Sequence, residues 1–476
     1  MYSQQLHGQF QGSPVRLRAF GLIATFALVL SACSGGSGAT AAPSAGAPAA
    51  NVLNGSGLVK ISFWHAMNGT PDKALQALVD KFNAANQGKI QVTANYQGNY
   101  DDNLAKYKAA IQSKQTPSLI MMYDVGTRLM IDSGQTIPMQ AFIDADKFDV
   151  SDLQPNILGY YSIGGKLYSM PFNTSMPILY YNKTAFAKAG LDPNTPPTTL
   201  SEIRADAEKL TVKDASGNVV QYGFGAAIYG WFMEQFTAVT NQEYCDNGNG
   251  RTAAAAKVLV NGPEQVQLMT WWAQMVKDGL AVNTGRITAD GQNAFKSGRV
   301  AINIESTGVL GGYLQAAQGK FDIGTGFYPK IQASDAGGPI IGGASLWIDQ
   351  ANHSPQEQRA AWEFVKFLMQ PENQTYWHTQ TGYFPVSKGA LNDPTDKAWV
   401  QKNPQFTTAI AQLQQTKLDP ATQGCLLGVM PQVRQNTELG MEKAILGQAT
   451  PQAALDAAVA ADQPLIDQYN QAKAGN

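Results

Sequence analysis

The sequence is poor in the residue types that most metal and redox sites require. Its 476 residues include three cysteines and four histidines, and none of them cluster at the spacing of a zinc site. We find no GxSxG elbow, P-loop or HExxH motif, and no helix-spaced acidic pair typical of acid and base catalysis. The sequence therefore predicts no metal, no cofactor and no catalytic residue, and it favours a protein that is not an enzyme.

Charge is also scarce. Charged residues make up 15% of the chain and the formal net charge is -2. The basic residues are interspersed with acidic ones, so neither a nucleic-acid footprint nor a polybasic membrane patch is predicted. Apolar residues account for 44%, which is typical of a globular body. A chain of this length is expected to form two lobes rather than one core.

The amino terminus predicts export. Arg16 and Arg18 precede an apolar stretch, Phe20–Leu30, which has the length of a signal-peptide core and is too short for a membrane span. It ends in Leu-Ser-Ala-Cys at residues 30–33, which resembles a bacterial lipobox. We expect residues 1–32 to be removed and Cys33 to be acylated, which would anchor the protein on the outer face of the cytoplasmic membrane. An ordinary signal peptide is the alternative.

A flexible tether is expected to follow the anchor. Residues 33–57 are almost wholly Ser, Gly, Ala, Pro and Asn, a composition that cannot bury a core. The two remaining cysteines, Cys245 and Cys425, form an even pair in a chain sent to an oxidising compartment. They would form a disulfide or remain as two free thiols, because the sequence gives no distance between them.

Strands and helices alternate from Leu58 onward. Thr70-Pro71 reads as a helix N-cap followed by proline at the first helical position. A second helix is predicted from about Asp101, and strands are predicted at 59–64, 89–96 and 118–123. This alternation predicts a parallel sheet with ligands beyond the carboxyl ends of its strands. A second alternating block starts at Ile178.

Several short blocks indicate a family. In chain order they are Phe63–Gly69, Gly98–Tyr100, Tyr123–Thr127, Pro171–Ser175, Leu179–Lys183, Ile340–Trp347, Thr381–Tyr383 and Met430–Arg434. The Tyr-Asn-Lys and Gly-Ala blocks are typical of extracellular solute-binding proteins in general. The Trp-His-Ala-Met-Asn-Gly and Met-Pro-Gln-Val-Arg blocks are similar to the glycerol-3-phosphate-binding proteins of Ugp-type ABC importers.

The resemblance implies a two-lobed α/β fold of the kind found in maltose-binding proteins, with a mostly parallel sheet in each lobe and the ligand in the cleft between them. Lobe 1 would comprise residues 58–172 and 344–388, and lobe 2 would comprise residues 175–342 and 390–476. The chain would cross between them near Phe172–Ser175, Ile341–Ala344 and Val386–Asn392. The resemblance also implies a monomer that delivers its solute to ABC permease subunits.

Carried over motif by motif, the ligand-binding residues would be Tyr100, Asp124, Ser175, Trp231, Ser306, Gly343, Tyr383 and Arg434. The guanidinium of Arg434 would bind phosphate with help from the two serine hydroxyls and the Gly343 amide. Asp124 would accept hydrogen bonds from glycerol hydroxyls, and the aromatic rings would form walls. Simpler roles stay open: a surface ion pair for Arg434, a core position for Trp231, a tight turn for Gly343, and caps or turns for the serines.

Two departures from the family pattern bear on the ligand. Ile228 stands where relatives often carry the first tryptophan of Trp-x-x-Trp, and Asp124 stands where glutamate is frequent. Both changes enlarge the site, which favours glycerophosphocholine over sn-glycerol 3-phosphate, with the quaternary ammonium against an aromatic ring. A sugar or oligosaccharide receptor is the alternative within the class. A secreted glycerophosphodiester hydrolase is the alternative outside it, and the metal ions or histidine pair that such chemistry uses are not evident in the sequence.

Overall fold

The first of two sheets contains the amino-terminal strands. The computed structural model describes residues 46–474; the signal peptide, Cys33 and about half of the predicted tether lie outside this range. The strand order is β2 (Ile90–Tyr96), β1 (Val59–His65), β3 (Leu119–Tyr123), β14 (Gly342–Asp349) and β4 (Thr136–Ile137), with β7 (Met170–Ser175) also paired to β14. Strands β1, β2 and β3 are parallel, as predicted.

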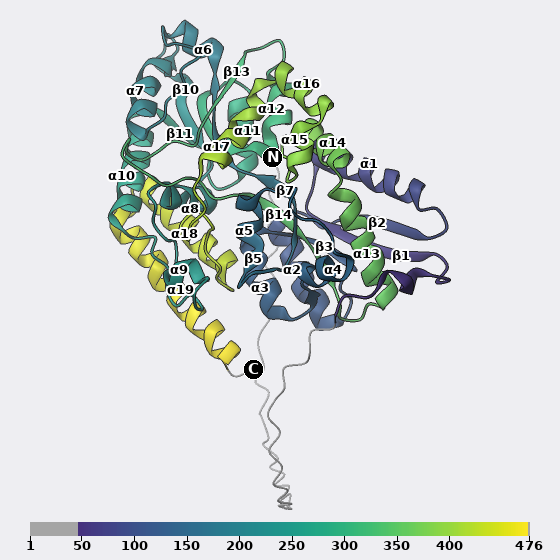
Figure 1. Ribbon diagram of the computed structural model, residues 1–476. Coiled ribbons are helices and arrows are strands. Elements are labelled where there is room, and N and C mark those ends of the chain that lie inside the picture. Colours follow the sequence, from purple (N-terminus) through teal and green to yellow (C-terminus); the bar gives the residue numbers. More distant parts are fainter. Residues whose placement is uncertain (1–45, 475–476) are drawn as a thin grey trace, which may run out of the picture. The chain divides into compact units, whose positions relative to one another are not determined.

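The second sheet is built from the middle of the chain (Figure 1). Its order is β11 (Ala281–Asn283), β10 (Val219–Ala226), β12 (Val300–Ser306), β8 (Pro177–Asn182) and β13 (Ile323–Gly326), and β9 (Val212–Lys213) pairs with β10. A small hairpin, β5 (Ser162–Ile163) and β6 (Lys166–Leu167), stands apart. These two helix-flanked sheets confirm the predicted two-lobed α/β fold.

The expectation of mostly parallel sheets is wrong. Strand β14 is antiparallel to β3, β4 and β7, and β8 is antiparallel to β12 and β13. Both sheets are therefore mixed. The reason is that β14 and β8 directly adjoin the segments that pass from one sheet to the other, so they enter each sheet without the helical crossover that makes neighbouring strands parallel.

Helices cover both sheets. Around the first lie α1 (Gly69–Ala85), α2 (Tyr100–Ser113), α3 (Thr127–Ser133), α4 (Met139–Asp146), α5 (Pro155–Tyr161), α13 (Pro355–Leu368), α14 (Pro371–Thr381) and α15 (Lys388–Asn392). Helix α1 begins at Gly69, and its first backbone bond runs from the Asp72 N–H to the Asn68 carbonyl. Thr70 is thus already inside the helix, and its prediction as the N-cap is wrong by two residues.

The second set of helices continues to the carboxyl end. It comprises α6 (Lys183–Lys188), α7 (Leu200–Leu210), α8 (Gly230–Val239), α9 (Asp246–Gly250), α10 (Pro263–Lys277), α11 (Thr288–Lys296), α12 (Leu310–Ala317), α16 (Pro394–Lys402), α17 (Thr407–Gln415), α18 (Met430–Ile445) and α19 (Pro451–Ala474). Short 3-10 turns are η1 (Ala50–Leu53), η2 (Asp124–Gly126), η3 (Thr307–Val309) and η4 (Pro404–Phe406). Helices α18 and α19 lie side by side (Figure 1).

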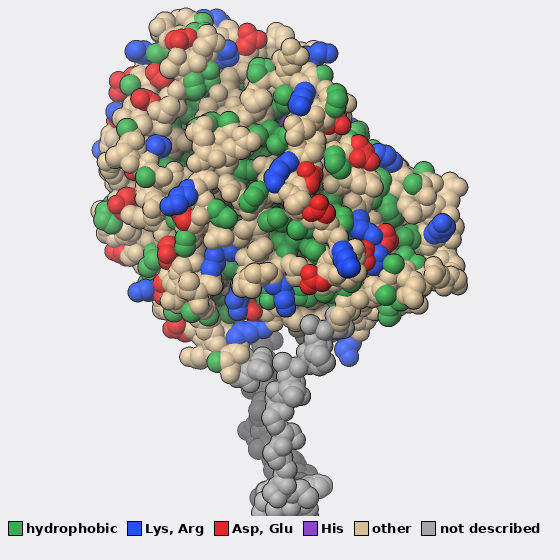
Figure 2. Space-filling view, viewed as in Figure 1, with side chains coloured by type: hydrophobic (Ala, Val, Ile, Leu, Met, Phe, Trp, Pro, Cys, Tyr) green, Lys and Arg blue, Asp and Glu red, His purple; other side chains and the backbone are tan. Residues whose placement is uncertain are grey.

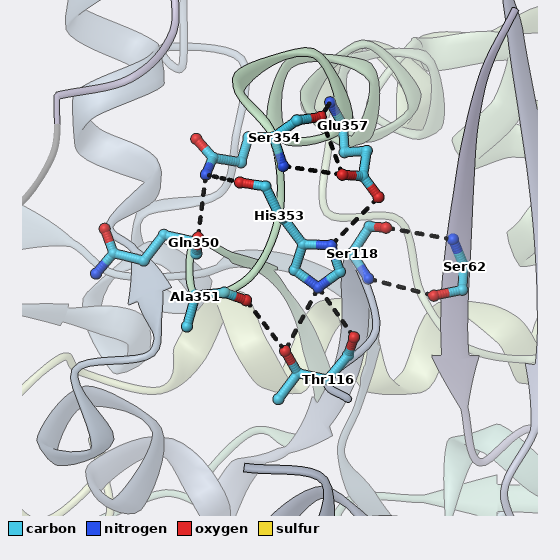
Figure 3. Close-up of polar contacts among 9 residues, drawn as sticks. Ser62, Thr116, Ser118, Gln350, Ala351, His353, Ser354 and Glu357 are labelled. Carbon is cyan, nitrogen blue, oxygen red and sulfur yellow. Dashed lines mark hydrogen bonds and ion pairs between the residues drawn. The ribbon is translucent and has the colours of Figure 1, made fainter. Parts of the chain in front are cut away.

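Burial explains the apolar run of β3. All five residues of Leu119–Tyr123 are buried, as is typical of a strand that lies between two others, here β1 and β14, in a sheet covered on both faces. Beside this strand, His353 joins the β14–α13 turn to the segment before β3 (Figure 3): its Nε2 lies 2.9 Å from the Thr116 carbonyl and its Nδ1 lies 3.4 Å from Glu357. This histidine therefore has a structural role.

The end of the predicted tether is ordered. Residues Ala50–Leu53 form η1, which packs on α13, and Leu53 contacts the core. Arg359 of α13 donates to the Pro48 carbonyl at 3.4 Å. The tether prediction is therefore wrong for residues 46–57, because its few apolar side chains are enough to hold this segment on a helix surface.

Cys245 and Cys425 are joined by a disulfide across 180 residues of sequence. It ties α9 to the segment before α18.

On the face shown in Figure 2, blue basic and red acidic side chains are interspersed without forming a patch of one sign. No helix among residues 46–474 has the length and apolar character needed to cross a membrane.

Candidate functional site

A cavity of about 510 Å³ lies where the ends of several strands from both sheets meet. From the first sheet come the β1–α1 turn, the start of α2 and the residue after β3. From the second come the start of α8, one face of α11 and the β12–α12 connection. Seven of the eight predicted ligand residues line it: Tyr100, Asp124, Ser175, Trp231, Ser306, Gly343 and Tyr383. Their role in binding stays a prediction.

Two segments that pass between the sheets form the floor. Ser175, at the end of β7, pairs with Gly342 at the start of β14, and Thr174 pairs with Gly343. Gly343 has φ +96°, and a Cβ there would stand 1.9 Å from the Asn173 carbonyl oxygen. Only glycine fits this position. Gly343 is a residue of strand β14, so the tight-turn explanation considered for it is wrong, and its role in binding stays a prediction.

Aromatic rings form two walls. Tyr100 is the first residue of α2, which Asn99 and Asp102 start with a reciprocal capping box. The Tyr100 ring stacks on Tyr123 with centroids 5.3 Å apart, and its hydroxyl accepts a 2.9 Å bond from the Asn173 amide. On the other side, Trp231 is both buried and in the cavity wall, and its indole N–H has no acceptor among the described residues.

Arg434, the eighth predicted residue, stands behind the wall and touches it. It is buried, so the surface ion pair considered for it is wrong. Its Nε and Nη2 donate to the two carboxylate oxygens of Glu234 at 2.7 and 2.8 Å. Nη2 also lies 3.4 Å from Asp124, and Nη1 lies 3.4 Å from the Tyr229 hydroxyl. A carboxylate thus holds one edge of the guanidinium, and phosphate binding by Arg434 stays a prediction.

Helix packing accounts for this pairing. Glu234 lies one turn after Trp231 on α8, so the two side chains share a face. A Cβ on Gly230 would stand 2.6 Å from Arg434 Cγ, which means that glycine lets α8 approach α18 closely. Glu234 was not among the residues predicted from the sequence. The three-residue spacing from Trp231 was the available signal.

The charges at this end of the cavity do not balance. Burial raises the pKa of Asp124 and of Glu234, and the nearby Arg434 opposes both shifts. Arg434 makes two short bonds to Glu234 and one long contact to Asp124. Arg434 therefore pairs mainly with Glu234, and burial remains the larger effect on the pKa of Asp124. One guanidinium cannot neutralise both carboxylates.

The cavity wall also holds three polar residues that were not predicted from the sequence. Gln292 and Lys296 lie four residues apart on α11, and Glu305 ends β12 beside Ser306. Ser306 itself caps η3, because its hydroxyl accepts a 3.1 Å bond from the Gly308 N–H. The i, i+4 spacing of Gln292 and Lys296 could have indicated a polar helix face.

Among residues 46–474, no group of three or more His, Cys, Asp or Glu side chains is arranged to hold a metal ion. The cavity wall instead offers hydroxyl and amide donors, one lysine and the buried carboxyl groups of Asp124 and Glu305, and Arg434 lies behind it. This arrangement can bind a small polar molecule from two sides at once, and closure of the two halves around it would complete the contacts.

Comparison with solved structures identifies the fold. The chain is similar to a UgpB from Mycobacterium tuberculosis in complex with glycerophosphocholine, with a TM-score of 0.74 and 24% identity, covering 86% of this chain and 99% of that one. It is also similar to a maltose/maltodextrin-binding domain from Bdellovibrio bacteriovorus bound to maltotriose, with a TM-score of 0.70 and 19% identity, covering 87% and 100%. At these identities the likeness concerns the fold.

Sequence comparison identifies the family. Residues 77–408 match the model of bacterial extracellular solute-binding proteins. The sn-glycerol-3-phosphate-binding periplasmic protein UgpB of Escherichia coli K12 is 36% identical over 423 residues, which cover 87% of this chain and 94% of the relative. UgpB of Yersinia pseudotuberculosis is 35% identical over 424 residues, which cover 88% and 95%. The chain therefore belongs to the bacterial extracellular solute-binding proteins, in the family of UgpB.

Proposed function

We propose that this protein captures glycerol-linked phosphates outside the cytoplasmic membrane, with glycerophosphocholine as the favoured ligand, and delivers them to the permease of an ABC importer. The observation that carries the proposal is the cavity itself. Residues from both halves of the fold line it with hydroxyl donors and a glycine floor, and Arg434 lies behind its wall. The names of the UgpB relatives support the glycerol phosphate class.

Charge favours a diester over a monoester. Asp124, Glu234 and Glu305 lie in or behind the wall, and Arg434 and Lys296 are the cations among them. A glycerol 3-phosphate dianion would add two negative charges to a site without a positive excess. Glycerophosphocholine brings one phosphate charge and one ammonium charge, so its entry leaves the local balance unchanged.

Titration calorimetry tests this proposal directly. Glycerophosphocholine, glycerol 3-phosphate and maltose are offered separately to the purified residues 46–476. We expect glycerophosphocholine to bind more tightly than the monoester, with no heat from maltose. Tighter binding of the monoester would sink the diester preference, and binding of maltose alone would sink the glycerol phosphate assignment.

A sugar receptor is the second candidate, because the fold also serves maltodextrin binding and aromatic rings such as Tyr100 and Tyr383 line the cavity. Arg434→Ala separates the two functions. Loss of this cation should abolish phosphate binding, whereas binding of a neutral sugar should survive it.

We further propose that binding is not followed by turnover. The relatives are solute-binding proteins, and Glu305 and Asp124 have no histidine or metal partner positioned to share in hydrolysis among the described residues. Prolonged incubation with glycerophosphocholine, followed by phosphorus NMR, should show an unchanged diester peak. Appearance of a monoester peak would establish the hydrolase instead.

The membrane anchor and the monomeric state are also proposals. The lipobox-like run ending at Cys33 supports acylation of that cysteine. Expression in a bacterial host with a labelled fatty acid should label the protein, and Cys33→Ala should prevent the labelling. Light scattering of purified residues 46–476 should give the mass of one chain.

A further inference from the structure

Glu305 is a buried carboxyl group in the wall of the ligand cavity. It is 5% exposed and lies in β12, immediately before Ser306. Its Oε1 accepts a 2.7 Å bond from the Ser306 N–H, and its Oε2 accepts a 3.2 Å bond from the Gln292 amide. Both donors are neutral. Within the described chain, this carboxylate therefore makes no ion pair of the kind that Glu234 makes.

Glu305 has a cationic side chain nearby but no direct ion pair among the described residues. Lys296 of α11 lines the same cavity and attracts Glu305 only through space. Three tyrosines from other elements also face it: Tyr180 of β8, Tyr313 of α12, and Tyr383 after α14. The phenols are uncharged at neutral pH, since burial raises the pKa of each. A cation brought in by a ligand would fill the gap in this arrangement.

The position of Glu305 matches the chemistry of the proposed ligand. Ser306 is one of the residues expected to donate to the phosphate, and Glu305 is its neighbour in the chain. In a glycerophosphodiester of an amino alcohol, two carbons separate the phosphate ester oxygen from the nitrogen. A phosphate near Ser306 would therefore bring the nitrogen within a few ångströms of the phosphate site, which is the neighbourhood of Glu305.

We propose that Glu305, oriented by Gln292, binds the cationic head group of the ligand and selects zwitterionic glycerophosphodiesters over anionic ones. This inference rests on the proposed function and deepens it. Arg434 and Ser306 would then hold the phosphate of the ligand, and Glu305 would hold its ammonium group. A buried carboxylate without a cation is costly in the empty site, so the ligand ammonium relieves that cost on binding.

Ionisation of Glu305 gives the proposal a second signature. Burial raises the pKa of Glu305 to about 7, against the opposing effects of the Ser306 and Gln292 hydrogen bonds and of Lys296. An ammonium ligand requires the ionised form. Its affinity should therefore increase as the pH rises from about 5.5 to about 8, by up to roughly thirtyfold, which is the change in the ionised fraction.

The test is Glu305→Gln, which keeps the shape and removes the charge. Calorimetry at about pH 8 compares glycerophosphocholine and glycerophosphoethanolamine with glycerophosphoglycerol, an anionic diester without a cation. We expect the two zwitterions to bind about tenfold more weakly and the anionic diester to bind as well as before or better. The matched control is Asp290→Asn, an exposed carboxylate on α11 outside the cavity wall, which should change neither.

Each outcome decides the proposal. If Glu305→Gln leaves the ratio of zwitterion to anion affinity unchanged, Glu305 does not contact the head group. If the variant fails to unfold cooperatively, the pH dependence of wild-type binding decides instead. An affinity for glycerophosphocholine that rises with pH, while the affinity for glycerophosphoglycerol does not, supports the proposal. The same pH dependence for both ligands overturns it. Failure of the wild type to bind any of these phosphates is a different result, which refutes the proposed function itself.

Discussion

Glu234→Gln would show whether Arg434 contacts the phosphate or only joins two helices. In the structure, Glu234 holds the Nε and Nη2 of Arg434 at 2.7 and 2.8 Å, and both side chains are buried. The substitution removes one charge and keeps one acceptor oxygen in place. Arg434 would then retain only the 3.4 Å contact with Asp124 as an ion pair.

Two opposite effects are expected from this change. Removing one partner of a buried ion pair costs about 3–5 kcal/mol. Because the carbonyl oxygen of the introduced amide and Asp124 compensate in part, we expect a loss of roughly 2–3 kcal/mol in the free energy of unfolding. Binding should change the other way. Removal of the Glu234 charge relieves its repulsion of a bound phosphate, so glycerol 3-phosphate binding should tighten about tenfold or more.

Urea unfolding and calorimetry on the same preparation measure the two effects. Glycerophosphocholine carries less negative charge, so its affinity should increase less than that of the monoester. Glu442→Gln is the matched control, since Glu442 pairs with Arg286 at 3.6 Å on the surface and should contribute less than about 1 kcal/mol. Unchanged or weaker binding of both phosphates by Glu234→Gln, together with the loss of stability, would refute a phosphate contact for Arg434.

Three further changes probe the scaffold. Gly343→Ala should destabilise the protein and abolish ligand binding in calorimetry, because its methyl group would collide with the Asn173 carbonyl at 1.9 Å; near-normal affinity would contradict the close packing of the floor. Cys425→Ala should lower the free energy of unfolding by up to about 5 kcal/mol, the loop entropy expected for a separation of 180 residues, and a reductant should then have no further effect on the unfolding midpoint. Burial raises the pKa of Asp349 to about 8 despite the bond from the Tyr107 hydroxyl. The protonated carboxyl therefore contributes stability at low pH, and this contribution is lost as the pH rises from about 4 to about 8. Asp349→Asn should gain stability over the wild type across that window, and parallel stability curves would contradict it.

Local patterns in the sequence were sufficient to predict the first strands and helices and, together with the family resemblance, most of the cavity wall. The alternation of strands and helices up to Tyr123 predicted three parallel strands, since period and turn residues are local properties. The same reasoning put Tyr100 and Asp124 at strand or helix ends, where the cavity lies. Short blocks similar to those of a known family extended this to Trp231, Ser306 and Gly343.

Only the tertiary structure determines which charged side chains around the cavity lie close together. Arg434 and Glu234 are 200 residues apart in the sequence, and no local pattern pairs them; their contact depends on how closely α8 packs on α18. The pairing of Cys245 with Cys425 and the antiparallel entry of β14 likewise follow from long-range packing. Glu305 reads in the sequence as one more strand residue. Its burial beside neutral donors, which makes it a candidate for binding a cation, exists only once the chain has folded.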